Sequence, residues 1–197
     1  MRIKITLTSL TIVLVFFGCQ DTTTFKHTKK NTIGKETDTC FSLVNHLELI
    51  NYQDPKGEYK IQLPKNWWLE ETLVLNNYGV TVVDSTLSPS EGWGIAISTL
   101  KNTMPLKEYI NNEINKIEKD NNVRILDTGE QIINKEKFYW IKCEYDDELK
   151  TTSYLNYFNN NDKNRVYIVN SFANGLKNIN YRICQLQSLI KTFELKE

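Results

Sequence analysis

The sequence predicts an α+β domain in which helices pack against an antiparallel β-sheet. Three observations lead to this prediction. Several segments alternate apolar and polar residues with a period of two, which is typical of half-buried strands. Two other segments repeat apolar residues at spacings of three and four, which indicates helices that bury one face. The connections between the later strands are short and polar, and such connections favour antiparallel neighbours.

The first predicted strands precede the first helix. Residues Tyr59–Leu63 alternate strictly and end at Pro64, a residue that cannot donate to a strand ladder. Val80–Val83 and Trp93–Leu100 are predicted as the next strands, with a polar loop containing Pro89 between them.

Two helices and a run of four strands account for the rest of the chain. Pro105 stands where a helix can begin, ahead of a stripe made by Leu106, Tyr109, Ile110, Ile114 and Ile117. Four strands are predicted after this helix, at Arg124–Ile133, Lys137–Tyr145, Thr152–Phe158 and Arg165–Ala173. Gly175 interrupts the last strand, and a closing helix is expected over Asn178–Phe193.

The segment Gly57–Trp67 resembles the opening strand of PsbP-like domains, because an apolar strand ends in a proline and a tryptophan follows. This fold is shared by the photosystem protein PsbP, the Mog-type Ran-binding proteins and many small bacterial lipoproteins. The resemblance covers most of Tyr52–Leu195 and implies an α/β/α sandwich. It carries over no metal-binding or Ran-binding residue, because members of one fold bind different partners.

The N-terminal segment Met1–Cys19 reads as a bacterial lipoprotein export signal. Two cations and an apolar run, Ile5–Phe17, lead to Gly18 and Cys19, the position at which such signals are cleaved and lipid is attached. A simple secretory signal and an uncleaved anchor are the alternatives. The apolar run is shorter than the roughly 20 residues that a spanning helix needs.

We therefore expect residues 1–18 to be removed and Cys19 to carry lipid, including palmitate. Residues 19–40 are polar and predict a flexible tether, and residues 41–197 predict one PsbP-like globular domain. This arrangement places the protein in the bacterial cell envelope, anchored to the outer membrane and facing the periplasm or the surface.

The charge balance argues against a nucleic-acid partner. The chain has 24 basic and 24 acidic residues, and loss of Arg2 and Lys4 with the signal leaves the mature protein slightly acidic. No basic field then remains to attract phosphate backbones.

Three cysteines remain once Cys19 is assigned to lipid. Cys143 alternates with apolar strand residues, which predicts a buried, inert thiol. Cys184 falls on the polar side of the closing helix, and Cys40 at the start of the domain is its expected partner in an oxidising compartment. Two free thiols, or a pairing with Cys143, are the alternatives.

The sequence contains no constellation that names a reaction, so no catalytic residue, metal ligand or cofactor is assigned. His46 is interpreted as a surface or edge residue, because one folded histidine cannot by itself build a metal site. The acidic run from Glu144 to Glu148 lacks the spacing of a calcium loop and predicts a solvated hairpin turn. Glu70 and Glu71 are adjacent in an extended segment and should point to opposite faces.

The candidate partner surface consists of Trp67, Trp68 and Trp93, which lie beside loops. Tryptophans in such positions either cover the core or anchor an interface. We expect a non-enzymatic lipoprotein that binds an envelope protein or a small ligand. An enzyme or metal-dependent protein with a scattered site, and a structural accessory subunit of an envelope complex, are the alternatives.

Overall fold

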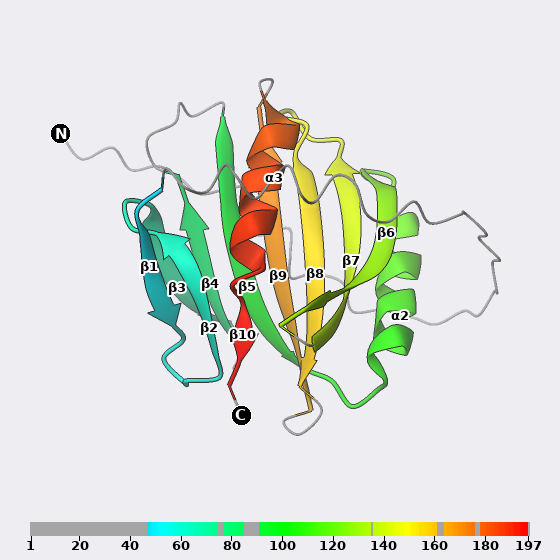
Figure 1. Ribbon diagram of the computed structural model, residues 1–197. Helices are drawn as coiled ribbons and strands as arrows, with labels where there is room; N and C mark the ends of the chain where they lie inside the picture. The colour runs from blue at the N-terminus through cyan, green and yellow to red at the C-terminus, as the bar shows by residue number, and fades with distance from the viewer. Residues whose placement is uncertain are drawn as a thin grey trace. The chain divides into compact units, whose positions relative to one another are not determined.

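The computed structural model describes residues 47–74, 77–84, 91–134, 136–160, 164–175 and 178–196, all within the unit formed by residues 34–197. The elements, labelled as in Figure 1, follow in chain order. They are β1 (Leu49–Gln53), β2 (Tyr59–Pro64), β3 (Trp68–Val74), β4 (Asn77–Val83), β5 (Gly92–Lys101), α2 (Leu106–Glu118), β6 (Val123–Ile133), β7 (Glu136–Tyr145), β8 (Thr152–Asn160), β9 (Arg165–Asn174), α3 (Ile179–Ile190) and β10 (Glu194–Leu195).

These strands form two antiparallel sheets. The large sheet has the order β3-β4-β5-β9-β8-β7-β6, and the small sheet has the order β1-β2-β10. In Figure 1 the helix α3 and the small sheet lie in front of the large sheet, while α2 lies beside β6 and β7. The last strand, β10, returns to the start of the domain and pairs with β2 through Glu194 and Lys60.

The large sheet buries apolar residues on both of its faces, because successive residues of its strands belong to two different apolar clusters. Phe138 of β7 joins the cluster that α3 and the small sheet cover, and Ile141 of the same strand joins the cluster under α2. The apolar stripe predicted for the first helix packs against the sheet, because all five of its residues belong to the cluster under α2. The α+β prediction, with helices on an antiparallel sheet, is therefore confirmed.

The structure differs from the prediction at the end of the closing helix. Helix α3 ends at Ile190, three residues before the expected Phe193. After Ile190 the turn tightens, because Thr192 N donates to Leu189 O and Phe193 N donates to Ile190 O, both at 2.9 Å. The Thr192 hydroxyl accepts from Gln62 N at 2.9 Å, which ties this turn to β2. The chain is thereby directed into β10, and Phe193 enters the core. In the part of the chain described, no helix is long and apolar enough to cross a membrane.

Candidate functional site

Two of the three tryptophans belong to the core. Trp93 is only 8% exposed, and its indole Nε1 donates to Asp84 Oδ2 at 2.9 Å. The ring of Trp67 packs against it with centroids 4.9 Å apart. Trp68 is 45% exposed. The three tryptophans therefore do not form one surface. Of the three, Trp68 is the one exposed enough to contact a partner, and this role is a proposal.

The exposure of Trp68 follows from the register of β3 on β4. Leu69 packs toward the core on the α3 side, so the preceding residue of the strand, Trp68, faces the opposite side of the sheet. Trp68 lies opposite Val83 of β4, and Val83 lies opposite Gly94 of β5. Gly94 in turn lies opposite Phe172 of β9.

Trp68, Val83 and Phe172 therefore lie in one row across the sheet, and we call them the Trp68 row. Gly94 keeps this row shallow, since a Cβ there would lie 2.9 Å from Phe172 Cζ and 2.4 Å from Val82 O. The helix on this face, α2, packs over β6 and β7 near the opposite edge of the sheet. The row is an apolar strip ending in an exposed tryptophan, a kind of side chain that often anchors interfaces.

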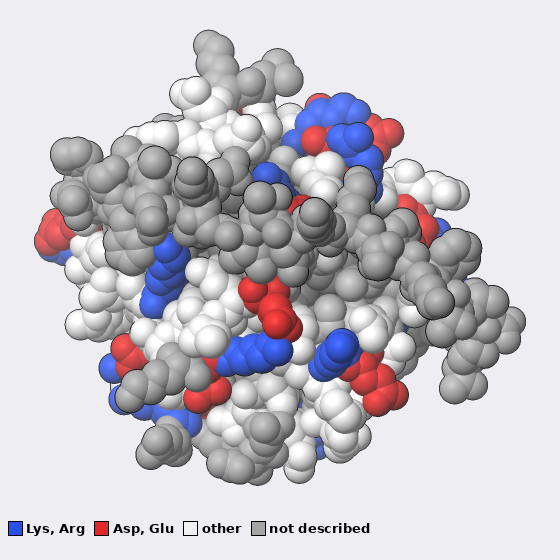
Figure 2. Space-filling model, turned by 45° about the vertical axis from the view of Figure 1, so that its right-hand side comes forward, with Lys and Arg blue, Asp and Glu red and all other residues white. Residues whose placement is uncertain are grey.

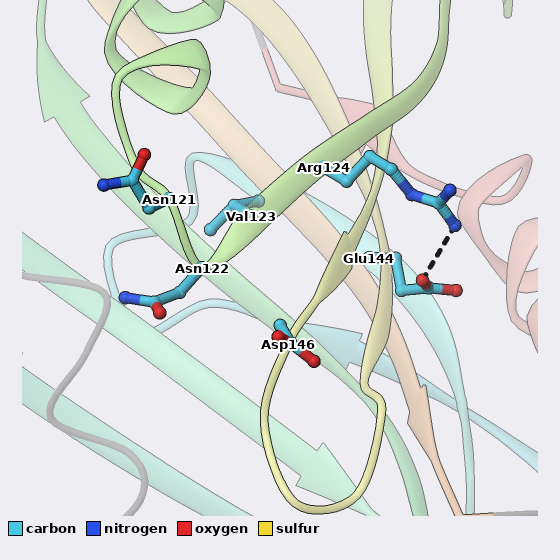
Figure 3. Close-up of a pocket in the computed structure, with 6 residues that line it drawn as sticks. All are labelled: Asn121, Asn122, Val123, Arg124, Glu144 and Asp146. Carbon is cyan, nitrogen blue, oxygen red and sulfur yellow. Dashed lines mark hydrogen bonds and ion pairs between the residues drawn. The ribbon is translucent and has the colours of Figure 1, made fainter.

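A polar pocket of about 250 Å³ lies at the far edge of the same sheet, where α2 leads into β6 (Figure 3). Arg124 donates to Glu144 Oε1 at 2.9 Å across the β6–β7 ladder. Asp146 N donates to Asn122 O at 2.7 Å, which joins the two loops that border the pocket. Arg124 pairs with Glu144, and Asp146 pairs with Lys150 outside the pocket, so each charged side chain that lines the pocket has a partner of opposite charge.

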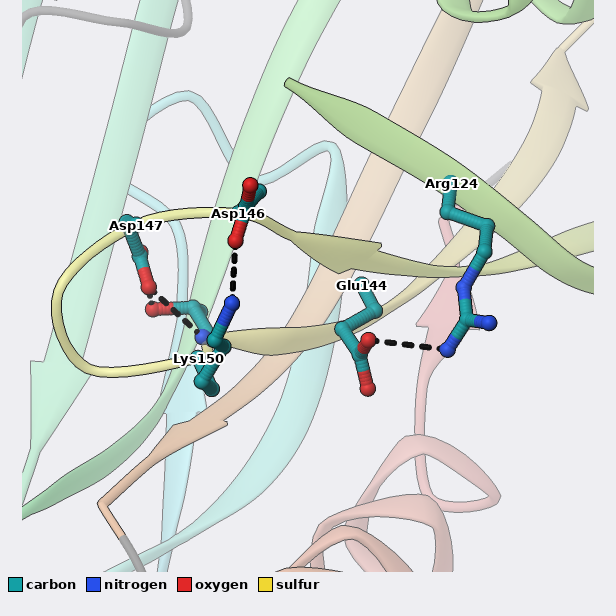
Figure 4. Close-up of polar contacts among 6 residues, drawn as sticks. Arg124, Glu144, Asp146, Asp147 and Lys150 are labelled. Atoms are coloured by element: carbon teal, nitrogen blue, oxygen red, sulfur yellow. Dashed lines mark hydrogen bonds and ion pairs between the residues drawn. The ribbon is translucent and has the colours of Figure 1, made fainter. Parts of the chain in front are cut away.

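The acidic hairpin between β7 and β8 is held by its own contacts (Figure 4). Lys150 donates to Asp146, and this hydrogen bond lowers the pKa of the Asp146 carboxyl. Asp147 accepts from Thr151 N at 2.9 Å and from the Thr151 hydroxyl at 2.6 Å. Each of these carboxylates thus has a local partner. Among the described residues no group of three or more acidic, histidine or cysteine side chains is placed to hold a metal ion.

A tyrosine cluster joins the two sheets. The Tyr52 hydroxyl of β1 donates to Glu71 Oε1 of β3 and lies 2.9 Å from the Tyr78 hydroxyl of β4. Burial is the main cause that raises the pKa of Tyr78 to about 12 and the pKa of Tyr52 further. Phenols that stay protonated serve here as hydrogen-bonding groups between sheets.

The neighbouring glutamates point as predicted. Glu71 faces Tyr52 on the α3 side of the large sheet, and Glu70 pairs with Thr81 on the other side. Because the strand separates them, the two carboxylates cannot act on one substrate atom as an acid–base pair.

The cysteines are partly placed. Cys143 is a free, fully buried thiol, and burial raises its pKa to about 11, which makes it unreactive. Cys184 is disulfide-bonded. Cys19, Cys40, His27 and His46 lie outside the described residues, so the Cys40–Cys184 pairing remains a prediction.

No protein-family model matches the chain, and no curated protein matches it in sequence. Solved structures do share its fold. LpqN of Mycobacterium tuberculosis, involved in cell envelope biogenesis, aligns with a TM-score of 0.52 and 10% identity over 78% of this chain and 93% of its own. The Ran-binding protein Mog1p of Saccharomyces cerevisiae gives 0.50 and 10% over 76% and 96%.

Cyanobacterial PsbP from Synechocystis aligns less well, with a TM-score of 0.48 and 12% identity over 86% of this chain and 98% of its own. The fold assignment rests on LpqN and Mog1p. The domain has the PsbP/Mog-like fold. This confirms the resemblance drawn from Gly57–Trp67.

Proposed function

We propose that this chain is a lipid-anchored protein of the bacterial cell envelope whose PsbP/Mog-like domain binds a protein partner without catalysing a reaction. The observation that carries the proposal is the N-terminal segment Met1–Cys19, with its cationic start, short apolar run and Gly18-Cys19 junction. Lipid at Cys19 holds the mature chain to the outer membrane, since two acyl chains already give stable anchoring.

The Trp68 row supports partner binding. It combines an exposed indole with two half-buried apolar neighbours, Val83 and Phe172, on a sheet face. Large aromatic side chains with this kind of support contribute most of the binding free energy at many interfaces. LpqN and Mog1p support such a role, because Mog1p is described as Ran-binding and LpqN as involved in cell envelope biogenesis.

The anchor is tested by replacing Cys19 with Ser. We expect the protein to leave the membrane fraction and to lose incorporation of labelled palmitate, because the attachment sulfur is gone. Palmitate that still enters the Cys19→Ser chain would overturn the lipid anchor. This result is independent of any partner.

The partner surface is tested by capture from native envelope with the full chain. We expect Trp68→Ala to recover about tenfold less of the specific partner, because removal of a central aromatic side chain often costs more than 1 kcal/mol of binding free energy. The matched control is Tyr181→Ala, since Tyr181 on α3 is similarly exposed at 48%. Equal loss with both variants, or loss with neither, contradicts the assignment of the Trp68 row.

A further inference from the structure

The edge strand β6 leaves large apolar side chains in solvent. It is the terminal strand of the large sheet, and its second edge has no partner strand in the part of the chain described. Leu126 is 40% exposed, and Ile132, at 70%, is the most exposed large apolar side chain among the described residues. A long edge strand with exposed apolar residues is a template for pairing with another strand.

Leu126 and Ile132 lie on the same face of this strand. Ile125 opposes Cys143 and Asp127 opposes Lys142, so Leu126 is the extra residue of a β-bulge and emerges beside Ile125. Beyond the bulge, Thr128 opposes Ile141 and Ile132 opposes Lys137, which restores the alternation. Ile125 and Ile141 belong to the cluster under α2, so this register places Leu126 and Ile132 on the α2 side of the large sheet.

We propose that two copies of this chain pair antiparallel through β6, in the register that places Gly129 opposite Gly129. In this register Leu126 of one copy faces Ile132 of the other, and the same contact occurs twice about the two-fold axis. Directly opposed side chains in an antiparallel pair have Cβ atoms about 5 Å apart, so each apolar side chain covers its counterpart.

Charge and apolar contact together favour this register over the two that are shifted toward the start of the strand. A pairing centred on Asp127 would set two aspartates directly opposite each other, which is destabilising. A pairing centred on Thr128 would place Leu126 against Glu130 and Arg124 against Ile132. The register centred on Gly129 instead sets Asp127 against Gln131 and Glu130 against Thr128, with no like charges opposed.

The two remaining carboxylates near the axis are already compensated. The Glu130 side chains of the two copies lie diagonally across the axis, and in each copy Glu130 pairs with Lys137 at 2.8 Å. Gly129 itself lies beneath the indole of Trp140, where an added Cβ would be 2.5 Å from Cζ2. The centre of the interface is thus flat and carries no side chain that would hold the strands apart.

Cysteine crosslinking of the full chain in its envelope tests the register. Two tagged forms, Leu126→Cys and Ile132→Cys, are expressed together and oxidised mildly. We expect a disulfide between the two forms and none within either form alone, because two copies of residue 132 would lie about 20 Å apart along the strands. Met104→Cys, exposed at 38% outside β6, is the control and should give no crosslink.

The size of the purified full chain in density-matched detergent gives the second measurement. We expect a dimer in sedimentation equilibrium, and about tenfold or more weaker association for Ile132→Lys, because a charge replaces an apolar contact that occurs twice. Met104→Lys should leave the association unchanged. A monomer at all concentrations, a crosslink formed by Ile132→Cys alone, or a crosslink to a different protein would each overturn the proposal.

Discussion

At the scale of single residues, Tyr59 shows how the core combines packing with an unsatisfied polar atom. Its side chain is 1% exposed, stacks on Phe193 at 5.3 Å and meets the edge of Tyr167 at 5.9 Å. The Tyr59 hydroxyl has no hydrogen-bond partner among the described residues, whereas the Tyr167 hydroxyl donates to Glu58 Oε2 at 3.1 Å. The two neighbouring tyrosines therefore differ in whether the hydroxyl is hydrogen-bonded, and this difference decides whether the hydroxyl stabilises or destabilises the fold.

Removal of each hydroxyl should have opposite effects on stability. We expect Tyr59→Phe to raise the free energy of unfolding by about 1 kcal/mol, because the buried group loses its desolvation penalty. Tyr167→Phe should lower it by about 1 kcal/mol, because it breaks a bond to a carboxylate. Denaturant unfolding of both variants measures the difference. A clear loss of stability in Tyr59→Phe would mean that its hydroxyl is hydrogen-bonded in solution.

The local sequence could identify the tryptophans of the candidate site but could not distinguish the exposed one from the buried ones. Sequence proximity to loops marked Trp67, Trp68 and Trp93 alike as candidate anchors. What separates them is long-range geometry: Trp93 is buried and donates to Asp84, and Trp68 faces outward because β3 pairs with β4 in one particular register. The local pattern of residues predicts neither this register nor the place of Phe172 in the Trp68 row, because both depend on how distant strands pair.

At the scale of elements, the strands with a marked apolar pattern were predicted, whereas β1, β3 and β10 were not. Lys137–Tyr145 and Arg165–Ala173 carry apolar residues at several successive positions because each strand is covered on both faces by different layers. Strand β1 buries no side chain fully, and β3 carries the polar pair Glu70 and Glu71 within its seven residues. The two residues of β10 become a strand only because β2 is beside them.

The β7–β8 hairpin gives a prediction at this scale. Asp147 closes the turn through both the backbone N–H and the hydroxyl of Thr151, while Glu148 is exposed. We expect Asp147→Ala to lower the free energy of unfolding by about 1 kcal/mol, since these bonds order the turn. Glu148→Ala, in the same turn, should stay within about 0.5 kcal/mol of the parent. Equal effects of the two changes in chemical denaturation would refute this role for Asp147.

At the scale of the whole domain, the small sheet must be held against the large one at both of its margins. The Tyr52–Glu71–Tyr78 cluster joins β1 to β3 and β4. At the start of β2, Arg165 of β9 donates to Glu58 Oε2 at 2.8 Å. The side chains of this second pair are only 27% and 13% exposed, so water screens them less than it screens the pairs at the surface.

The Glu58–Arg165 pair should therefore contribute to the joining of the sheets, in contrast to an exposed pair. We expect Arg165→Met to lower the free energy of unfolding by about 2 kcal/mol, because it leaves the Glu58 carboxylate largely buried without its cation. The control is Lys65→Met, which removes the partner of Glu48 in a pair whose side chains are 52% and 65% exposed. It should cost less than about 0.5 kcal/mol, because solvated ion pairs contribute little. Urea unfolding followed by near-ultraviolet circular dichroism measures both variants, and equal losses would show that the inter-sheet pair is no stronger than a surface pair.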